Sequence, residues 1–590
     1  MITEDRALET TRWQLEPLLD GTTVDDLLEQ ALEGARAFAR SRRGKLGELD
    51  ARGVATAMRE LEAIWDRVGR AGSYASLWFS LDTEDPERGA LLQATRERGA
   101  AIETELLFFE LEWNSLPDDH VEPLLAAEEL GFCSHYLRMM RRYRPHQLSE
   151  PEERVLTELE VSGAGAFRRL FTEQVSALRV ELPEGESSLE EALSRLQDPD
   201  RSRRSEAAAA VTGSLRPDLR WRSFVMNSLL HDKATRDRLR SYPHWLAARN
   251  LANEASDESV EALIEAVRSR YELARRWYRL KSRLLGLERL SWYDRMAPIG
   301  QSEERIGFDE ARSLVLECYG EFSPELGEVA GAFFEDGFVD APPRPGKRGG
   351  AFSASTVPSA HPYVMLNYTA RATDVLTLAH ELGHGVHQSL ARPQGVYHHT
   401  TPLTVSETAS IFGETIVLER LLERSADAAA RLSLLAQSLD GVVAAIFRQV
   451  AMNRFENAIH SERREGGELS VPRFAELWLE TQSELLGDSV VLDDDYGQWW
   501  SYVWHFVDAP GYVYAYAYGH LLALSVYRRY EEEGPGFVPS YLELLRAGGS
   551  RPPEELGRIV GVDLSDPGFW VAGLDLVERR LEEAESLAAG

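Results

Sequence analysis

The chain has 590 residues, of which 43% are hydrophobic and 27% are charged, so it can bury a large core and is neither fibrous nor disordered. Its formal net charge of −32 at pH 7 disfavours nucleic acid and anionic membrane surfaces as partners. The two cysteines, Cys133 and Cys318, are too few for a disulfide framework or a cysteine zinc site, and they fit a reducing compartment.

The first residues of the chain are acidic and amphipathic and show no signal-peptide pattern. No run of 18 apolar residues predicts a transmembrane helix. We therefore expect a cytoplasmic protein without nucleic-acid or membrane partners. The sequence leaves its oligomeric state open.

Most of the chain shows the period of about 3.6 residues that is typical of amphipathic helices. In residues 258–285 the apolar side chains fall on one face and the charges on the other. The same pattern recurs at 25–40, 89–113, 410–425, 426–450 and 519–533. We expect these helices to be packing elements rather than binding surfaces.

Residues 179–203 interrupt this helical pattern with prolines, glycines and a run of charges. Such a composition is typical of a domain boundary. We predict a helical N-terminal domain over residues 1–190 and a second domain over residues 200–590.

A short strand and a long helix follow a second irregular stretch. Residues 336–362 are too dense in proline, glycine and serine to form one helix, whereas 362–368 (PYVMLNY) are apolar and β-prone. A long helix is expected to begin near Asp374. The predicted fold is mainly α, with one small β element directly before this helix.

That helix contains the sequence His380-Glu381-Leu382-Gly383-His384. On an α-helix, positions i and i+4 differ by ~40° in azimuth and ~6 Å in rise, so both imidazoles can bind one ion. Zinc bound there would acidify a water to a pKa of about 7, and the glutamate between the histidines could take the proton as the water attacks a carbonyl. The motif thus predicts a hydrolytic zinc site.

A catalytic zinc site needs a third protein ligand. His387 lies on nearly the same face, but its rise from His380 is ~10 Å, so a straight helix cannot bring all three imidazoles to one ion. We expect His387 to lie behind the ligands or in the core. Glu407, Glu414 and Glu419 follow in the next predicted helix, and their spacing alone does not choose among them.

The sequence resembles oligoendopeptidase F, within the wider thimet-oligopeptidase family of zinc peptidases. The resemblance spans nearly the whole chain in the expected order. Its stretches are 148–171, 271–298, GKRGGAFSA (346–354), PYVMLNY, the HExxH helix, SETASIFGE (406–414), RQVAMNRFENAIH (448–460), HFVDAPGYVYAYAYG (505–519) and 545–570.

The resemblance implies that Glu407, 23 residues past His384, is the third zinc ligand. It implies that Glu414 orients an imidazole through its other ring nitrogen. It also implies that His505 and Tyr512 stabilise the developing oxyanion, with Tyr516 nearby. Tyr514 and Tyr518 alternate with these tyrosines, and some of the four must belong to the core.

Two features depart from the family pattern and affect the expected cleavage preference rather than the reaction. Gly511 stands where relatives often carry an aromatic residue, and residues 353–361 contain less glycine than is common.

Taken together, the resemblance implies an α-rich zincin with a deep substrate channel, one Zn²⁺ per chain and oligopeptide substrates cut at internal bonds. The strand at 362–368 would be the edge along which substrate lies, and Tyr363 in it is a candidate for substrate contact. Two alternatives are a zinc carboxypeptidase or dipeptidase, and a peptide-binding protein that has lost catalysis. The first needs a fixed cation for the terminal carboxylate, and the sequence does not reveal one.

Overall fold

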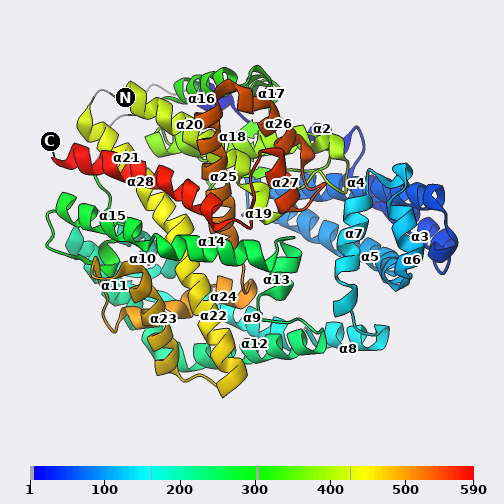
Figure 1. Ribbon diagram of the computed structural model, residues 1–590, viewed down its shortest axis with the longest axis horizontal. Helices are drawn as coiled ribbons and strands as arrows, with labels where there is room; N and C mark the ends of the chain where they lie inside the picture. The colour runs from blue at the N-terminus through cyan, green and yellow to red at the C-terminus, as the bar shows by residue number, and fades with distance from the viewer. Residues whose placement is uncertain (1–5, 161, 301–304, 426, 590) are drawn as a thin grey trace. The chain divides into compact units, whose positions relative to one another are not determined.

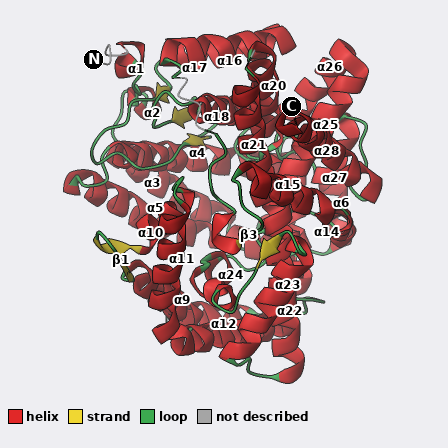
Figure 2. Cartoon of the chain, turned by 90° about the vertical axis from the view of Figure 1, so that its left-hand side faces the viewer, coloured by secondary structure: helices red, strands yellow, loops and turns green. Residues whose placement is uncertain are grey.

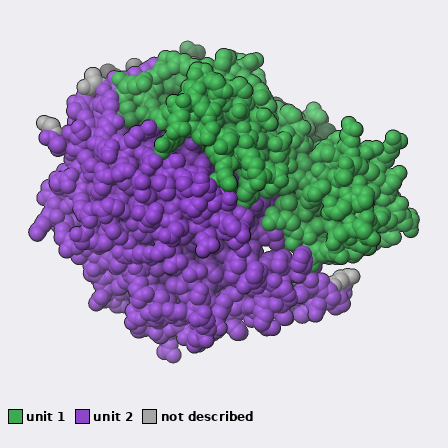
Figure 3. All heavy atoms as spheres, viewed as in Figure 1, with its two compact units in different colours: residues 1–144, 304–423, 526–563 green, residues 145–303, 424–525, 564–590 purple. Residues whose placement is uncertain are grey.

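The computed structural model describes residues 6–160, 162–300, 305–425 and 427–589 and is built largely from helices (Figures 1 and 2). The chain forms two compact units, each assembled from three separate stretches (Figure 3). Unit 1 comprises residues 1–144, 304–423 and 526–563, and unit 2 comprises 145–303, 424–525 and 564–590. The division at 1–190 and 200–590 does not follow these units and stays a prediction.

Unit 1 begins with three long helices that pack against one another around a shared apolar core. Each begins where a side chain accepts backbone N–H groups of the first turn, namely Thr23, Asp50 and Asp85. The helices of unit 1 are α1 Arg6–Thr10, α2 Glu16–Leu19, α3 Val24–Arg42, α4 Ala51–Leu81, α5 Pro86–Ser115, α6 Asp118–Leu125, α7 Ser134–Arg142, α16 Phe308–Phe322, α17 Pro324–Glu335, α18 Ala372–Ala391, α19 Leu403–Ser406, α20 Thr408–Arg424, α26 Val538–Ala547 and α27 Pro553–Ile559. The helices predicted at 25–40, 89–113 and 410–425 are confirmed as α3, α5 and α20.

The sheet of unit 1 has the strand order β4 (Val339–Asp340), β6 (Tyr363–Met365), β5 (Phe352–Ala354). β6 pairs parallel with β4 and antiparallel with β5. The predicted strand at 362–368 is therefore confirmed, but the prediction that it forms the sheet edge is wrong, because β6 has a neighbour on both sides. The irregular stretch before it supplies these neighbours.

The structure places Tyr363 of β6 in the core, whereas the prediction was that it contacts substrate. Its side chain is fully buried, and its hydroxyl donates to the carbonyl of Gln14 at 2.8 Å. Its ring packs edge-on against Trp13 and Phe338. Tyr363 thus belongs to the core that supports the sheet.

Unit 2 contains the remaining helices, and α25 passes from unit 2 into unit 1. They are α8 Glu150–Glu160, α9 Ala164–Ser176, α10 Leu189–Ser194, α11 Arg201–Leu215, α12 Leu219–Leu239, α13 Ala247–Ala252, α14 Asp257–Ser269, α15 Tyr271–Leu284, α21 Ala428–Val442, α22 Arg448–Gly466, α23 Val471–Leu486, α24 His505–Asp508, α25 Tyr514–Glu533 and α28 Pro567–Ala589. Its strands are β1 Arg179–Leu182, β2 Gly185–Ser188, β3 Leu290–Ser291 and β7 Val490–Val491.

Three predictions in unit 2 need adjustment. The single helix expected at 258–285 is broken at Arg270 into α14 and α15, and a one-residue break leaves the apolar period almost unchanged. The stretch at 179–203 contains an antiparallel hairpin of β1 and β2 inside unit 2. The helix expected at 426–450 is longer, because a π-helical turn at 443–447 joins α21 to α22.

Within the described part of the chain, the run Ala428–Gly466 is the one helix long and apolar enough to cross a membrane by length and composition. It packs against α23 and α28, and it buries the polar side chains of Asn453 and Glu456. Such contacts are typical of a core helix. The predicted absence of a membrane partner stays a prediction.

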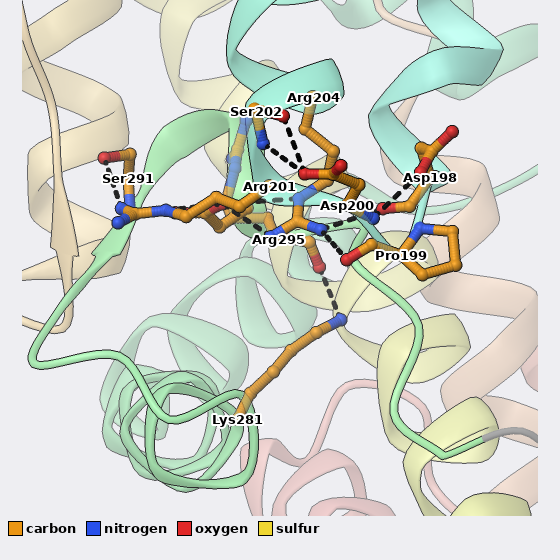
Figure 4. Close-up of polar contacts among 10 residues, drawn as sticks. Asp198, Pro199, Asp200, Arg201, Ser202, Arg204, Lys281, Ser291 and Arg295 are labelled. Atoms are coloured by element: carbon orange, nitrogen blue, oxygen red, sulfur yellow. Dashed lines mark hydrogen bonds and ion pairs between the residues drawn. The ribbon is translucent and has the colours of Figure 1, made fainter.

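A buried charge network holds α11 and the turn after β3 together (Figure 4). Asp294, fully buried, accepts hydrogen bonds from the guanidinium groups of Arg201 and Arg204. Lys281 of α15 donates to the carbonyl of Arg295 at 2.7 Å. Removing one partner of a buried ion pair typically costs about 3–5 kcal/mol, because the other charge is left buried and uncompensated.

Candidate active site

The helix that carries the HExxH motif begins two residues before the predicted start at Asp374. The carboxylate of Asp374 accepts the backbone N–H groups of Thr369 and Arg371 at 2.6 and 3.1 Å, which holds the first turn. The apolar face of α18 is buried, whereas the side chains of His380 and His384 keep 24% and 17% of their surface. The imidazoles therefore project from the buried helix toward accessible space.

The helix α20 approaches α18 very closely at Gly383, between the two histidines. A Cβ atom at Gly383 would lie 2.6 Å from the carbonyl oxygen of Ala409 and 2.7 Å from the Cα of Ser410. Only glycine fits this contact. Glu407 lies in the turn between α19 and α20, so the close approach brings its carboxylate to the imidazoles.

His380, His384 and Glu407 place their ligand atoms within 4.8 Å of one another. The Nε2 atoms of His380 and His384 lie 3.4 and 3.5 Å from the same carboxylate oxygen of Glu407. Two imidazole nitrogens and one carboxylate oxygen are donors that Zn²⁺ prefers, and three protein ligands leave one position for water or substrate. The group fits a catalytic zinc ion.

The other nitrogen of His380 faces Glu414, at 3.1 Å between Nδ1 and Oε2. This contact orients the ring so that Nε2 points to the metal group. Ser410 donates to Oε2 of Glu407 at 2.8 Å, the same oxygen that faces both imidazoles. The hydroxyl of Tyr319 donates to the carbonyl of Ala379 at 2.6 Å and so fixes the helix beside His380.

The close approach of the imidazoles and carboxylates shifts their pKa values. Burial lowers the pKa of His380, but its hydrogen bonds to Glu407 and Glu414 outweigh burial and raise that pKa to about 10. Burial raises the pKa of Glu407, but its contacts with His380 and His384 hold the pKa well below its usual range. Glu407 therefore stays anionic and attracts positive charge.

Glu381 projects beside the histidines with 9% of its surface exposed. Burial raises the pKa of its carboxyl, which brings the group closer to a base that works near neutral pH. Ser353, in β5, lies near enough to lower the pKa of this carboxyl slightly, against the larger effect of burial. β5 is therefore close to the candidate base, which the sequence did not indicate.

His387 is separate from the metal group. It is 4% exposed, and burial lowers its pKa to about 3, so it is neutral. The structure thus places it in the core behind His384, one of the two positions expected.

The aromatic side chains of His505, Tyr512 and Tyr516 form a second cluster, in unit 2. His505 Nε2 lies 3.3 Å from the hydroxyl of Tyr516, and the ring of Tyr512 lies 5.0 Å from that of Tyr516 and 6.1 Å from that of His505. Trp504 stacks on His505 at 3.9 Å and is 50% exposed. Burial, helped by the charge of Arg448, lowers the pKa of His505 to about 4, so it is neutral at pH 7.

The structure separates the four alternating tyrosines into two pairs. Tyr514 and Tyr518 are fully buried, and their hydroxyls meet the side chains of Asn253 and Ser259. Tyr512 and Tyr516 are partly exposed beside His505. Only the second pair can meet a substrate.

Gly511 shapes the turn that presents Tyr512. Its φ is +75°, in the region that favours glycine, and its N–H donates to the buried carboxyl of Glu456 at 2.7 Å. A Cβ atom at Gly511 would lie 2.5 Å from the Cδ1 of Leu246. The side chain of Leu246 therefore occupies the space into which a side chain at this position would project.

The supporting residues Ser353, Ser410, Tyr319 and Glu456 were not predicted as parts of the site. Ser353, Ser410 and Glu456 stand inside the stretches that carry the family resemblance, and this position was the signal available for them. Tyr319 lies outside those stretches and 60 residues before Ala379, so no local pattern pointed to its role.

The sequence model of the family described as peptidase family M3 matches residues 194–576 of this chain. The sequence model of the family described as oligopeptidase F matches residues 112–179. The chain belongs to peptidase family M3. Oligopeptidase PepF of Bacillus subtilis (strain 168) is 26% identical to this M3 peptidase, with 98% of this chain and 87% of PepF covered. Group B oligopeptidase PepB of Streptococcus agalactiae serotype III (strain NEM316) is 27% identical, with 98% and 96% covered.

Solved structures share the fold. A protein from Chlamydophila abortus has a TM-score of 0.87 at 23% identity, with 98% of each chain covered. Oligoendopeptidase-F from Enterococcus faecium has a TM-score of 0.72 at 22% identity, with 95% of this chain and 98% of that chain covered. The predicted resemblance and the mainly helical fold are confirmed. This M3 peptidase is a metallopeptidase that hydrolyses oligopeptides.

Proposed function

We propose that the chain is a zinc-dependent oligoendopeptidase that cuts internal bonds of short, unstructured peptides. His380, His384 and Glu407 hold one Zn²⁺, and Glu381 is the general base. The observation that carries this proposal is the convergence of three ligand atoms within 4.8 Å beside the buried Glu381. The identity of the metal rests on this donor set and on the family.

When bound, the zinc ion would supply the Lewis acidity that polarises the scissile carbonyl and acidifies a water. Glu381 accepts the proton of the attacking water and later delivers it to the nitrogen of the leaving amine. His505, which is neutral, and the phenol of Tyr512 can each donate one hydrogen bond to the oxyanion. Tyr516 supports His505 through its hydroxyl.

The substrate lies extended beside β5 rather than beside the predicted strand. β6 has strands on both sides, whereas β5 is at an end of the strand order. Ser353 of β5 is near enough to Glu381 to affect its pKa, so a chain that pairs with β5 would run close to the base.

The two cysteines are buried and free, which supports the proposed cytoplasmic location.

The test of the proposal is Glu381→Gln. Gln keeps the size of the side chain but cannot accept a proton, so the variant should bind zinc normally and lose at least ~10²-fold in rate. Metal content measured with peptide hydrolysis, before and after a chelator, separates the two roles. Near-normal hydrolysis by the variant, or hydrolysis that survives complete metal removal, would contradict the proposal.

A further inference from the structure

Arg249, on α13, lies directly beside the candidate oxyanion residue Tyr512. Its guanidinium carbon is 6.0 Å from the centre of the Tyr512 ring, and its Nε–H donates to the carbonyl of Pro510 at 3.5 Å. The side chain is partly exposed and lines an open cavity of about 400 Å³ in unit 2. Its position relative to Tyr512 is therefore held from two sides, while part of it faces a space large enough for a ligand.

The other cations that line this cavity each have a carboxylate partner. Arg168 pairs with Glu160 at 2.6 Å, Lys233 with Asp237 at 2.9 Å, Arg236 with Asp232 at 2.7 Å and Arg240 with Glu153 at 2.7 Å. Arg249 alone among them has no carboxylate within ion-pair distance in the parts of the chain that the structure covers.

Two nearby carboxyl groups do not neutralise Arg249. Asp508 lines the same cavity but lies beyond ion-pair distance. Glu456 uses one oxygen to accept the N–H of Gly511, and burial raises its pKa to about 8, so it is mostly uncharged at pH 7. The guanidinium therefore keeps its positive charge in a chain whose formal net charge is −32.

An unpaired, positioned guanidinium is suited to bind a carboxylate, since its planar N–H groups match both oxygens. An acidic ligand is repelled by most of this surface, so a local cation is needed to hold it. In a peptide, the carboxylate is either an Asp or Glu side chain or the free C-terminus.

We propose that Arg249 forms a subsite that binds a carboxylate of the peptide substrate next to Tyr512. This inference rests on the proposed function, because it assigns a substrate preference to the same site. It predicts that the enzyme favours peptides with a carboxylate at one particular distance from the scissile bond.

The test compares peptides of one length that differ only in carboxylates. One is neutral and amidated, a second series is amidated with Glu placed in turn at each position on either side of the scissile bond, and a third is neutral with a free C-terminus. Arg249→Met removes the charge, and Arg249→Lys keeps it without the planar fork. Arg220→Met is the matched control, because Arg220 is exposed in the same unit and its replacement by Met changes the net charge by the same amount.

We expect Arg249→Met to lower kcat/KM by roughly 10- to 100-fold for one carboxylate-bearing peptide, the usual effect of a charge-assisted contact. The neutral amidated peptide should change by less than about threefold, Arg249→Lys should be intermediate, and Arg220→Met should match the wild type. If the loss of kcat/KM is confined to the Glu series, the bound carboxylate is a side chain. If the loss is confined to the peptide with a free C-terminus, the bound carboxylate is the terminal one.

An equal loss on all peptides would show that Arg249 only positions Tyr512, and no loss on any peptide would show that it is not a subsite. Either result overturns the inference while the oligopeptidase activity stands. If the wild type cleaves none of the peptides, the proposed function itself fails.

Discussion

Glu407 and Glu414 both contact His380, but through different ring nitrogens. Glu407 lies on the Nε2 side, together with Nε2 of His384, and Glu414 lies on the Nδ1 side. Only the Nε2 side brings two imidazoles and a carboxylate to one point. The two glutamates should therefore differ in what they contribute to metal binding.

Glu407→Ala should abolish tight zinc binding, because it removes a ligand. Glu414→Ala should weaken binding by about 10–100-fold, because it only releases the orientation of His380. Zinc affinity measured by competition with a chelator checks both values. Glu419→Ala, a change at another acid of α20, serves as the control. The reverse order for Glu407 and Glu414 would refute the assignment of the ligand.

Tyr512 and Tyr514 provide a matched pair for testing the oxyanion role. Tyr512→Phe removes one hydroxyl with little change in volume, so kcat should fall ~10²-fold with a smaller change in KM, because the contact strengthens in the transition state. Tyr514→Phe removes a hydroxyl that meets Asn253 in the core. That variant should lower thermal stability and leave kcat unchanged.

Steady-state kinetics and thermal unfolding of both variants decide the matter. An unchanged kcat for Tyr512→Phe would assign Tyr512 to a structural role.

At the scale of elements, the site depends on how closely α20 approaches α18. The contact at Gly383 is between backbone atoms, which cannot move aside like the end of a side chain. Gly383→Ala should therefore separate the helices and draw Glu407 away from the histidines. We expect a loss of about 1–3 kcal/mol in the free energy of unfolding, as for other overpacked positions, and weaker zinc binding.

Gly331→Ala on α17 is the control for this change. A Cβ atom there meets no atom within 4 Å, and alanine favours a helix more than glycine does. Its stability should be equal or slightly higher, and its zinc affinity should be unchanged. Thermal unfolding and metal competition measure both effects, and a Gly383→Ala variant that behaves like this control would contradict the packing argument.

At the scale of the whole molecule, the proposed function limits the kind of substrate that can be cut. Glu381 is only 9% exposed, so the scissile bond must enter as an extended chain. A folded protein would have to unfold first, which costs ~5–15 kcal/mol. A short flexible peptide has no such cost.

We therefore expect rapid internal cleavage of unstructured peptides of roughly 6–20 residues, which span ~20–70 Å when extended. A folded protein that contains the same segment should be nearly inert, and denaturing it should restore cleavage. Mass spectrometry of the products after matched incubation makes the comparison. Efficient digestion of the folded protein would refute the size limit, and so would its failure to be cut after unfolding. The predicted deep channel stays a prediction.

The sequence alone determined the helical character of the chain, the HExxH helix and the pairing of His380 with His384. These features are local, because a spacing of four residues places two side chains on one face of any α-helix. The ligand Glu407 required the family resemblance, because Glu407, Glu414 and Glu419 all lie at acceptable distances along the chain.

Only the tertiary structure decided which strand is central and which tyrosines are buried. β6 has the composition of any short strand, and its place between β4 and β5 depends on pairing with residues outside its own segment. Tyr512 and Tyr514 are two residues apart in one motif, and only Asn253, more than two hundred residues earlier, marks Tyr514 as core. The role proposed for Arg249 also depends on the tertiary structure, because only the structure shows which carboxylates lie near a given arginine.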